Sequence, residues 1–379
     1  MKRTVIWIMA LAMVVTALFA GCASTPAAEE TTAVEPAEES ATQEEAATNE
    51  EAQPEESTGE ATAKVFLSIG LGGLGDLGYN DNAYNGAMQA KEELGIDLQV
   101  YEPTSVAEIE AQIMAVAASG EYDLILGVGS DNASGIEKAA LAYPEQTFAI
   151  YEAVFDLPNV LCANNATEQP AFLIGAMVAM LYQENLLPGV PEGTHMMGVI
   201  NGIAATENKK QIYGLEAGGA YIDPEFELVN MDAGSWTDQA KGKEIALALY
   251  ERGCGVVMHV AGSTGLGIFD AAKEYGGYCV GSGSNQNDLC DTVICSRIER
   301  MDTAIYSTIK GYIEGTLTAG SVRLGYAEGT VTVDFSGSKV TIPQEILDRV
   351  EEIKEKIISG EIVVPVTEEE VAAFREANQ

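Results

Sequence analysis

The chain has 379 residues, of which 20 are Lys or Arg and 58 are Asp or Glu, so its formal net charge is −38. This charge excludes nucleic-acid binding, because affinity for a phosphate backbone requires clustered cations, and a bare anionic lipid surface would repel the folded part as well. Hydrophobic residues make up 47% of the chain, which is ample for a core, and the length suits two domains or one large one.

Residues 1–22 have the pattern of an export signal. Lys2 and Arg3 precede an apolar segment, residues 5–19, that is too short for a comfortable membrane span. The signal ends in the letters LFAGC, which resemble the bacterial lipobox, so Cys22 is the predicted lipidation site. Lipid chains would anchor the protein to the extracytoplasmic face of the cell membrane. A cleaved signal with an incidental cysteine, or a membrane helix, is the alternative.

Residues 23–62 are predicted to form a disordered acidic tether. The segment is built mainly from Ala, Thr, Ser, Pro and Glu, and it carries twelve Glu with no Lys, no Arg and no aromatic residue. Such a composition cannot bury enough apolar surface to fold, and its charges keep the chain extended. The folded domain is therefore expected to comprise residues 63–379.

From residue 64 onward, strand and helix patterns alternate. Strand-like apolar runs occupy residues 65–69, 98–101, 124–128, 147–150, 160–163, 196–200, 228–231, 255–260, 277–281, 292–295 and 329–335. Helical patterns occupy residues 83–94, 106–118, 135–142, 169–182, 208–221, 238–250, 265–275, 301–314 and 343–358.

This alternation predicts an α/β fold, in which parallel sheets are covered by helices on both faces. Two Rossmann-like halves on one exported chain predict two lobes, with a hinge and an interlobe cleft that closes around a ligand. The first lobe is expected to comprise about residues 63–165 and 288–318. The second lobe is expected to comprise about residues 166–287 and 319–365.

A glycine-rich loop joins the first expected strand to the first expected helix. Its GLGGLG letters, residues 70–75, match the G-x-G-x-x-G dinucleotide fingerprint. The helix is expected to begin only near Asn80 or Asp81, both good N-caps, and Asp76 would repel a phosphate. A dinucleotide-dependent oxidoreductase is therefore only a minor alternative.

The chain shows no motif of an established enzyme class. It contains no G-x-S-x-G elbow and no P-loop. Its two histidines, His195 and His259, form no zinc-ligand spacing with the cysteines and are expected to be structural or superficial. Cys290 and Cys295 could pair across a turn, which sequence alone does not establish. The simplest interpretation is a cleft that binds a small molecule without catalysis, cofactor or metal.

Candidate ligand-binding residues follow the expected strands, because ligands bind outside the carboxyl ends of parallel strands. They are polar, aromatic or glycine residues in five loops: Asp76, Tyr79, Asn80, Ser130, Glu152, Trp236, Gly262 and Ser263. Each has a structural alternative. Asn80 could cap a helix, Asp131 or Asn132 could cap the helix after Ser130, Glu152 could be a solvated charge, and Trp236 could belong to the core.

Five stretches together resemble the basic membrane protein (BMP) family of substrate-binding lipoproteins, which includes purine nucleoside receptors. They are DLGYNDNAYNG from residue 76, YDLILGVG from 122, YPEQTFAI from 143, GSWTDQAKGKEIA from 234 and VVMHVAGSTGLGIFDAAKE from 256. The resemblance covers about residues 64–358. It implies a type I periplasmic-binding-protein fold with three hinge crossings, a monomer, and a purine nucleoside or similar ligand delivered to an ABC permease. A ligand sensor of the same fold for a membrane signalling partner is the alternative.

The resemblance also assigns residues. Asp76 and Asn80 match the family's D-x-x-F-N motif, with Tyr79 in place of Phe. Trp236 matches the aromatic residue of a G-S-F/W-x-D stretch, and Gly262 belongs to the stretch that matches an A-G-G-T-G loop.

Four positions depart from the family pattern. Glu152 stands where the family usually has Asp, and Glu299 stands where it often has Lys. Gly283 and Asn285 replace two carboxylates, although Asn285 remains a candidate ligand contact. Because such positions tend to hold the ribose in nucleoside binders, the departures leave the identity of the ligand open.

Overall fold

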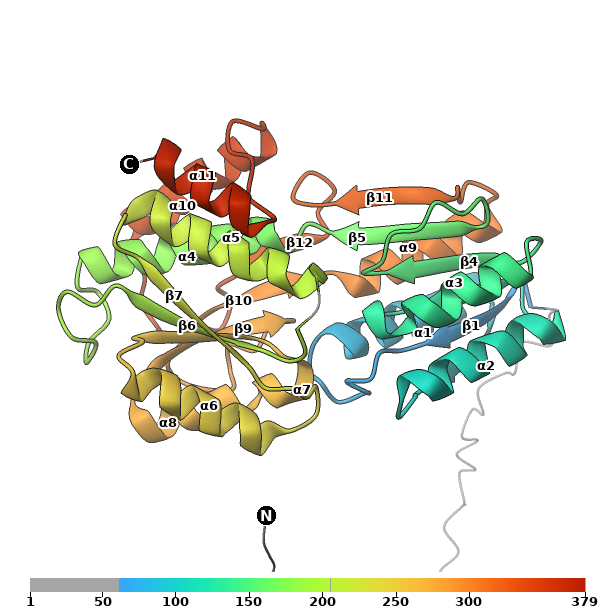
Figure 1. The fold of residues 1–379 in the computed structure, drawn as a ribbon, viewed down its shortest axis with the longest axis horizontal. Helices are drawn as coiled ribbons and strands as arrows, with labels where there is room; N and C mark the ends of the chain where they lie inside the picture. The colour runs from blue at the N-terminus through green and yellow to red at the C-terminus, as the bar shows by residue number, and fades with distance from the viewer. Residues whose placement is uncertain (1–60, 205, 379) are drawn as a thin grey trace, which may run out of the picture. The chain divides into compact units, whose positions relative to one another are not determined.

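The computed structural model describes residues 61–204 and 206–378. The expected export signal, the lipidation site Cys22 and nearly all of the expected tether at 23–62 lie outside the described residues. Two six-stranded sheets form the centres of two lobes (Figure 1).

The sheet of the first lobe is parallel throughout and has the strand order β11-β5-β4-β3-β1-β2. Its strands are β1 (Lys64–Ser68), β2 (Asp97–Tyr101), β3 (Leu124–Gly127), β4 (Thr147–Tyr151), β5 (Val160–Asn165) and β11 (Gly320–Leu324). Its helices are α1 (Tyr79–Leu94), α2 (Val106–Ser119), the 3₁₀ turn η1 (Ser130–Asn132), α3 (Ala133–Ala142) and α9 (Met301–Ile313).

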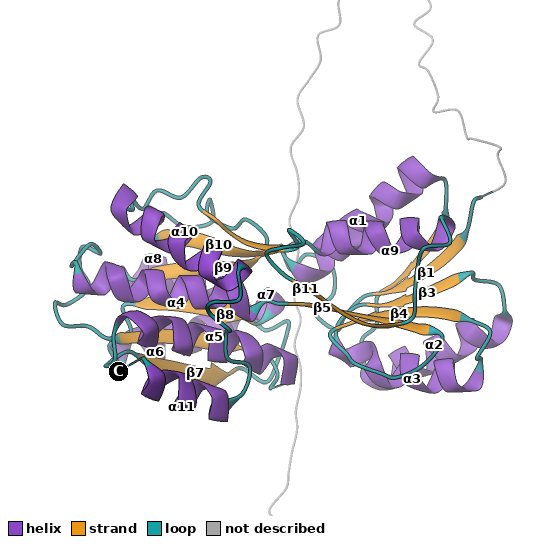
Figure 2. Cartoon of the chain, turned by 90° about the horizontal axis from the view of Figure 1, so that it is seen from above, coloured by secondary structure: helices purple, strands orange, loops and turns teal. Residues whose placement is uncertain are grey.

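Helices cover both faces of this sheet, α1 and α9 on one and α2 and α3 on the other (Figure 2). Alternate residues of β1 show why. Val65 and Leu67 pack in the core beneath α1 and α9, whereas Phe66 packs with Ile109 and Ile136 beneath α2 and α3. A strand buried on both faces accordingly reads as a continuous apolar run.

The sheet of the second lobe has the order β12-β10-β9-β8-β6-β7, with only β12 antiparallel to its neighbour. Its strands are β6 (Met196–Asn201), β7 (Glu227–Asp232), β8 (Val256–Val260), β9 (Tyr278–Gly283), β10 (Val293–Glu299) and β12 (Val331–Asp334). Its helices are α4 (Glu168–Gln183), α5 (Thr206–Ile222), α6 (Gln239–Glu251), α7 (Gly262–Gly265), α8 (Gly267–Tyr275), α10 (Gln344–Ile358) and α11 (Glu368–Ala377).

The lobe boundaries expected at 288–318 and 319–365 differ from the structure. β10 pairs with β9 and β12 in the second sheet, whereas the expected boundaries gave it to the first lobe. β11 pairs with β5 in the first sheet, although its residues were expected in the second lobe. The two strands exchange lobes because the chain crosses between the sheets after β10 and again after β11, which the order of strand patterns alone does not reveal.

Three connections cross between the lobes, and they are hydrogen-bonded to one another. The first follows β5, the second joins β10 to α9, and the third joins β11 to β12. The amide of Ala166 donates to the carbonyl of Leu324 at 2.6 Å, and the amide of Arg300 donates to the carbonyl of Thr330 at 2.8 Å. These bonds tie the first crossing to the third and the second to the third, as expected of a compact hinge.

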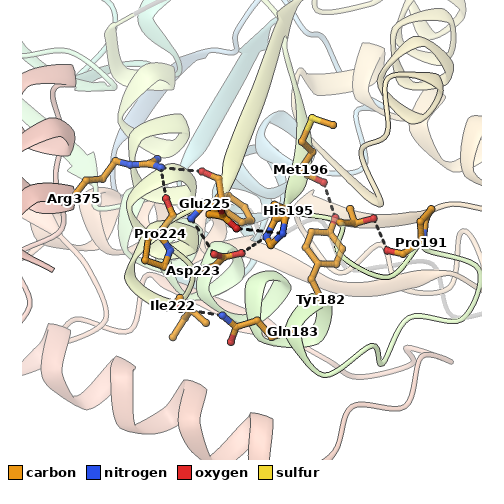
Figure 3. Close-up of polar contacts among 12 residues, drawn as sticks. Tyr182, Gln183, Pro191, His195, Met196, Ile222, Asp223, Pro224, Glu225 and Arg375 are labelled. Carbon is orange, nitrogen blue, oxygen red and sulfur yellow. Dashed lines mark hydrogen bonds and ion pairs between the residues drawn. The ribbon is translucent and has the colours of Figure 1, made fainter. Parts of the chain in front are cut away.

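The C-terminal helix α11 packs on the second lobe through one aromatic side chain and one guanidinium. The ring of Phe374 lies 5.7 Å from that of Phe172 and 6.2 Å from that of Tyr221. Arg375 donates to the carbonyls of Pro224 and Phe226, each at 3.1 Å (Figure 3). The sequence interpretation missed this helix, because its largely charged surface carries few apolar residues.

The five cysteines within the described part of the chain are free and buried. Cys290 and Cys295 therefore do not form the disulfide that their spacing allowed. The sulfur of Cys290 instead lies 3.3 Å from the hydroxyl of Thr292.

Candidate functional site

A cavity of about 680 Å³, counted out to its open mouth, is lined by residues of both lobes. In the first lobe the lining comes from the loops that follow β1, β3 and β4. In the second lobe it comes from α5, from the loop after β7, and from the ends of β8, β9 and β10. Except for α5, these segments lie at or after the carboxyl ends of strands, where open α/β sheets bind ligands.

Asp76 accepts hydrogen bonds from backbone amides at the start of α1. Its side chain is buried, with Oδ1 accepting from the amide of Gly78 at 2.9 Å and Oδ2 accepting from the amide of Asn80 at 3.0 Å. Burial raises the pKa of this carboxyl, and the backbone hydrogen bonds partly offset the rise. The expectation that Asn80 or Asp81 caps the helix was wrong: α1 begins at Tyr79, and Asp76 binds the free amides of its first turn.

The glycine-rich loop is held by side chains of the chain itself. The side-chain oxygen Oδ1 of Asn80 accepts from the backbone amide of Gly70 at 2.9 Å. The side-chain nitrogen Nδ2 of Asn80 donates to Asp76 Oδ2. Asp81 accepts from the amides of Gly75 and Leu77, at 2.7 and 2.9 Å. A pyrophosphate would need such amides, and here they are directed at carboxylates and an amide, so the loop does not act as a dinucleotide cradle.

Tyr79 and Glu152 stand at the first-lobe side of the cavity. The Tyr79 hydroxyl is buried, has no side-chain partner among the described residues, and lies near the backbone of Gly129. Burial, together with the nearby carboxylates of Glu152 and Glu299, holds the pKa of this phenol well above its usual value. Glu152 has a φ of +64°, which an L-residue adopts at a cost, and strain of this kind concentrates at functional sites.

Ser130 and Gly262 also line the cavity, from the beginnings of η1 and α7. Two other expected contacts, Ser263 and Asn285, do not line the cavity. The Asn285 side chain is directed away, because its Nδ2 donates to Asp334 Oδ2 at 2.9 Å and to the carbonyl of Ser336 at 3.0 Å.

Trp236 lines the cavity from the second lobe. Its indole lies directly over Gly202, where an added Cβ would come within 2.3 Å of Trp236 Cε3, so only glycine fits beneath the ring. The Nε1 atom is buried and has no hydrogen-bond partner within the described part of the chain. An unpaired buried N–H costs about 1–3 kcal/mol, and a ligand acceptor would recover that energy.

The sequence interpretation missed His259, although it lines the cavity at the end of β8. Its Nε2 lies 3.0 Å from Gln286 Oε1, which also accepts from the amide of Ser282 at 2.8 Å. The shared oxygen is an acceptor, so Nε2 carries the proton and Nδ1 is an acceptor without a partner in the described chain. Burial lowers the pKa of His259 to about 4, so the ring is neutral at physiological pH.

Arg297 and Glu299 form a buried ion pair at the end of β10. Their side chains are 4% and 3% exposed, and Nη1 of the arginine lies 3.2 Å from Oε2 of the glutamate. Arg297 Nη2 also donates to the hydroxyl of Ser282 at 3.0 Å, and Asn165 donates to the other oxygen of Glu299 at 3.0 Å. Arg297 and Glu299 are two residues apart on β10 and therefore lie on the same face of the strand.

Gln211, from α5, was not predicted either. Its side chain is 3% exposed, and its Oε1 is buried without a hydrogen-bond partner in residues 61–204 and 206–378. The pattern of α5 could not reveal this residue, because the sequence does not show which helix faces the cleft.

The cavity has an acidic lining. Four carboxyl groups line it, and the guanidinium of Arg297 is already paired with one of them. They belong to Asp76, Asp131, Glu152 and Glu299. Burial raises the pKa of Asp131 as well as that of Asp76. A site of this kind disfavours phosphates and other anions, and it suits neutral ligands rich in hydrogen-bond donors.

The two lobes, the hinge and the cleft are those of the type I periplasmic-binding-protein fold, which ABC solute-binding proteins have. Residues 63–368 match the Bmp family, described as ABC transporter substrate-binding protein PnrA-like, and the chain belongs to that family. This confirms the family predicted from the motifs, and it identifies the chain as a binding protein, not an enzyme.

Known relatives agree with this assignment. The chain is 28% identical to an uncharacterized lipoprotein of Pyrococcus abyssi over 83% of this chain and 88% of that protein. It is 27% identical to basic membrane protein A of Borreliella burgdorferi over 84% of this chain and 92% of that protein. A solute-binding protein of an ABC transporter system from Aeropyrum pernix superposes with a TM-score of 0.75, at 29% identity, over 83% of this chain and 98% of that one. The predicted two-lobed fold is thereby confirmed.

Within the described residues, no helix has the length and apolar character needed to cross a bilayer.

Proposed function

We propose that the protein captures a purine nucleoside in the interlobe cavity and delivers it to an ABC permease. The observation that carries this proposal is a set of three buried polar atoms, each without a protein partner in the described chain, that belong to residues lining one cavity. They are Gln211 Oε1, Trp236 Nε1 and His259 Nδ1. Since native proteins leave few buried polar atoms unpaired, these three are available to a ligand.

The aromatic residues suit the base. Tyr79 and Trp236 reach the cavity from different lobes, so closure brings both rings to the same ligand. Stacking on an aromatic ring is worth about 1–3 kcal/mol for a nucleobase. The two acceptors, on Gln211 and His259, suit ring or exocyclic N–H groups, and the Trp236 N–H suits a ring nitrogen or carbonyl.

The carboxylates suit the sugar. Glu152 and Glu299 lie close enough to the Tyr79 phenol to raise its pKa, so acceptors gather at that side of the cavity. Carboxylate oxygens accept hydrogen bonds from vicinal hydroxyl groups, which a ribose presents. This arrangement replaces the family carboxylates that are absent at Gly283 and Asn285.

The proposal includes attachment to the membrane. Acylation at Cys22 would hold the binding domain on the extracytoplasmic face, and the 23–62 segment would give it reach to a permease. The same fold could serve a ligand sensor instead, and permease and ATPase genes beside this one would favour transport.

An isothermal titration of residues 63–379 tests the ligand. We expect inosine, guanosine or adenosine to bind, the corresponding 5′-monophosphates to bind more weakly because of the acidic lining, and free ribose to bind least. If no nucleoside binds, the nucleoside proposal fails, and sugars and free bases become the next candidates.

A further inference from the structure

Two loops from different lobes touch each other beside the cavity. One is the loop of residues 70–78 before α1, and the other is the loop of residues 284–292 after β9. The Leu77 carbonyl accepts from Gln286 Nε2 at 3.0 Å and also from the hydroxyl of Ser284. Asn82, in the first turn of α1, donates to the carbonyl of Gly283 at 3.2 Å. The cleft in this structure is therefore closed at this point.

The backbones themselves meet at Gly78 and Gly283. Gly283 has a φ of +93°, and a Cβ added there would lie 2.9 Å from the Cα of Gly78. Only glycine allows the lobes to come this close. The departure from the family pattern at Gly283 thus removes a carboxylate and permits a direct contact between lobes.

Gln286 joins this contact to the cavity. Its side-chain oxygen accepts from His259 Nε2 and from the amide of Ser282, both in the second lobe. With the oxygen held in that direction, the amide nitrogen must point the other way, toward Leu77 of the first lobe. Gln286 is 2% exposed, and its bonds to His259 and Ser282 are buried, whereas its bond to Leu77 is partly buried at the edge of the contact.

We propose that Gln286 is the latch that couples the ligand-facing His259 to closure of the two lobes. It acts as a positioning residue, because it touches His259 and Leu77 while His259 faces the cavity. The inference rests on the binding role of the protein and does not depend on which ligand is bound.

The hydrogen bonds of Gln286 explain why ligand binding at His259 and closure of the two lobes favour each other. A ligand that bonds His259 Nδ1 fixes the imidazole with its Nε2–H directed at Gln286. This orientation fixes the Gln286 amide and keeps its N–H groups directed at the first lobe. When the lobes separate, the Gln286–Leu77 bond is lost to water, so ligand and closure stabilise the same arrangement.

The first test uses the full chain without ligand. In Gln286→Glu the side chain keeps an acceptor for His259 and Ser282 but loses the donor to Leu77 and places an oxygen against its carbonyl. Since one such bond contributes about 0.5–1.5 kcal/mol, we expect amides of residues 77–82 to exchange hydrogen roughly two- to tenfold faster, with core strands unchanged. The matched control is Asn285→Ala in the same loop, whose side-chain amide bonds only within the second lobe.

A second variant guards against misfolding. Ser284→Ala removes the other donor to Leu77 with a small change at a partly exposed site, and we expect a smaller acceleration of exchange in the same segment. Exchange at residues 77–82 that matches the wild type in both variants, or in Ser284→Ala alone if Gln286→Glu does not fold, overturns the latch.

A second measurement uses inosine as the probe. We expect Gln286→Glu to release inosine severalfold faster while its association rate stays near that of the wild type, because the latch acts after the ligand has entered. A slower association with unchanged release would contradict the proposal. If the wild type does not bind inosine, guanosine and then adenosine replace it as the probe. If none of the three binds, the nucleoside proposal fails, and the exchange experiment alone decides the latch.

Discussion

The two histidines of the chain differ in how many of their ring nitrogens have a polar partner in the protein. His195 sits at the base of the second lobe, with Nδ1 2.5 Å from Asp223 Oδ2 and Nε2 3.8 Å from Glu225 Oε2 (Figure 3). His259 sits in the cleft, where only one ring nitrogen has a partner among the described residues. The first region completes its hydrogen bonds internally and thereby fixes a turn. The second leaves buried atoms unpaired, which is the property of a site that awaits a ligand.

The largest expected effect is in the cleft. Arg297→Met leaves Glu299 buried without its cation, and breaking a buried pair from one side costs about 3–5 kcal/mol of unfolding free energy. Urea denaturation measures this loss. The double variant Arg297→Met/Glu299→Met should recover much of it, because both charges are then gone. A single variant as stable as the wild type would show that the pair is not shielded from water.

His259 makes the stability of the folded protein depend on pH. The pKa of His259 is about 4 in the folded protein, below its ordinary value of 6.5, so the unfolded chain binds the extra proton first. Stability from this group is complete above pH 6.5 and is lost as the pH falls toward 4, by about 3 kcal/mol. We expect His259→Gln to flatten the fall in unfolding free energy between pH 6.5 and 4. An unchanged slope would mean that the ring is hydrated in solution.

The aromatic residues separate binding from stability. Trp236→Ala should weaken nucleoside binding by about 1–3 kcal/mol while the melting temperature stays close to that of the wild type. Phe374→Ala is the matched control, because that ring packs against Phe172 and Tyr221, and none of the three residues lines the cavity. It should lower the melting temperature and leave the affinity alone. Titration calorimetry and thermal melting of both variants measure the difference, and equal affinities in both would place Trp236 outside the ligand contact.

The smallest expected effect is at His195. Its side chain is 39% exposed, and a glutamine at this position keeps an N–H that can donate to Asp223, so less than about 1 kcal/mol should be lost. His195→Gln should therefore change the unfolding free energy and the affinity very little at pH 7. A loss comparable to that of Arg297→Met would show that the two regions are not energetically distinct.

The sequence predicted most elements because strands buried on both faces and amphipathic helices leave strong patterns. β1, with its apolar run, and α2, capped by Ser105, lie within one or two residues of their expected ranges. β11 was missed because it is a short edge strand with exposed residues at its centre. The exchange of β10 and β11 between lobes was missed because strand order is a long-range property.

The candidate site was predicted unevenly for the same reason. Residues in loops that follow strands, such as Tyr79 and Trp236, could be found from the pattern, and both line the cavity. His259 and Arg297 lie inside apolar strands, so the sequence pattern suggests that they belong to the core and gives no sign that they line a cavity. Alternation along β10 places Arg297 and Glu299 on one face, but only the folded chain shows that this face borders the cleft.

The most direct test of the proposed function is mass spectrometry of small molecules released by denaturing the purified protein. Binding proteins of this kind often retain their ligand through purification, and we expect a purine nucleoside in amounts comparable to the protein. A released sugar, free base or amino acid in that amount would contradict the nucleoside assignment and would show that Glu152 and Glu299 select a different ligand.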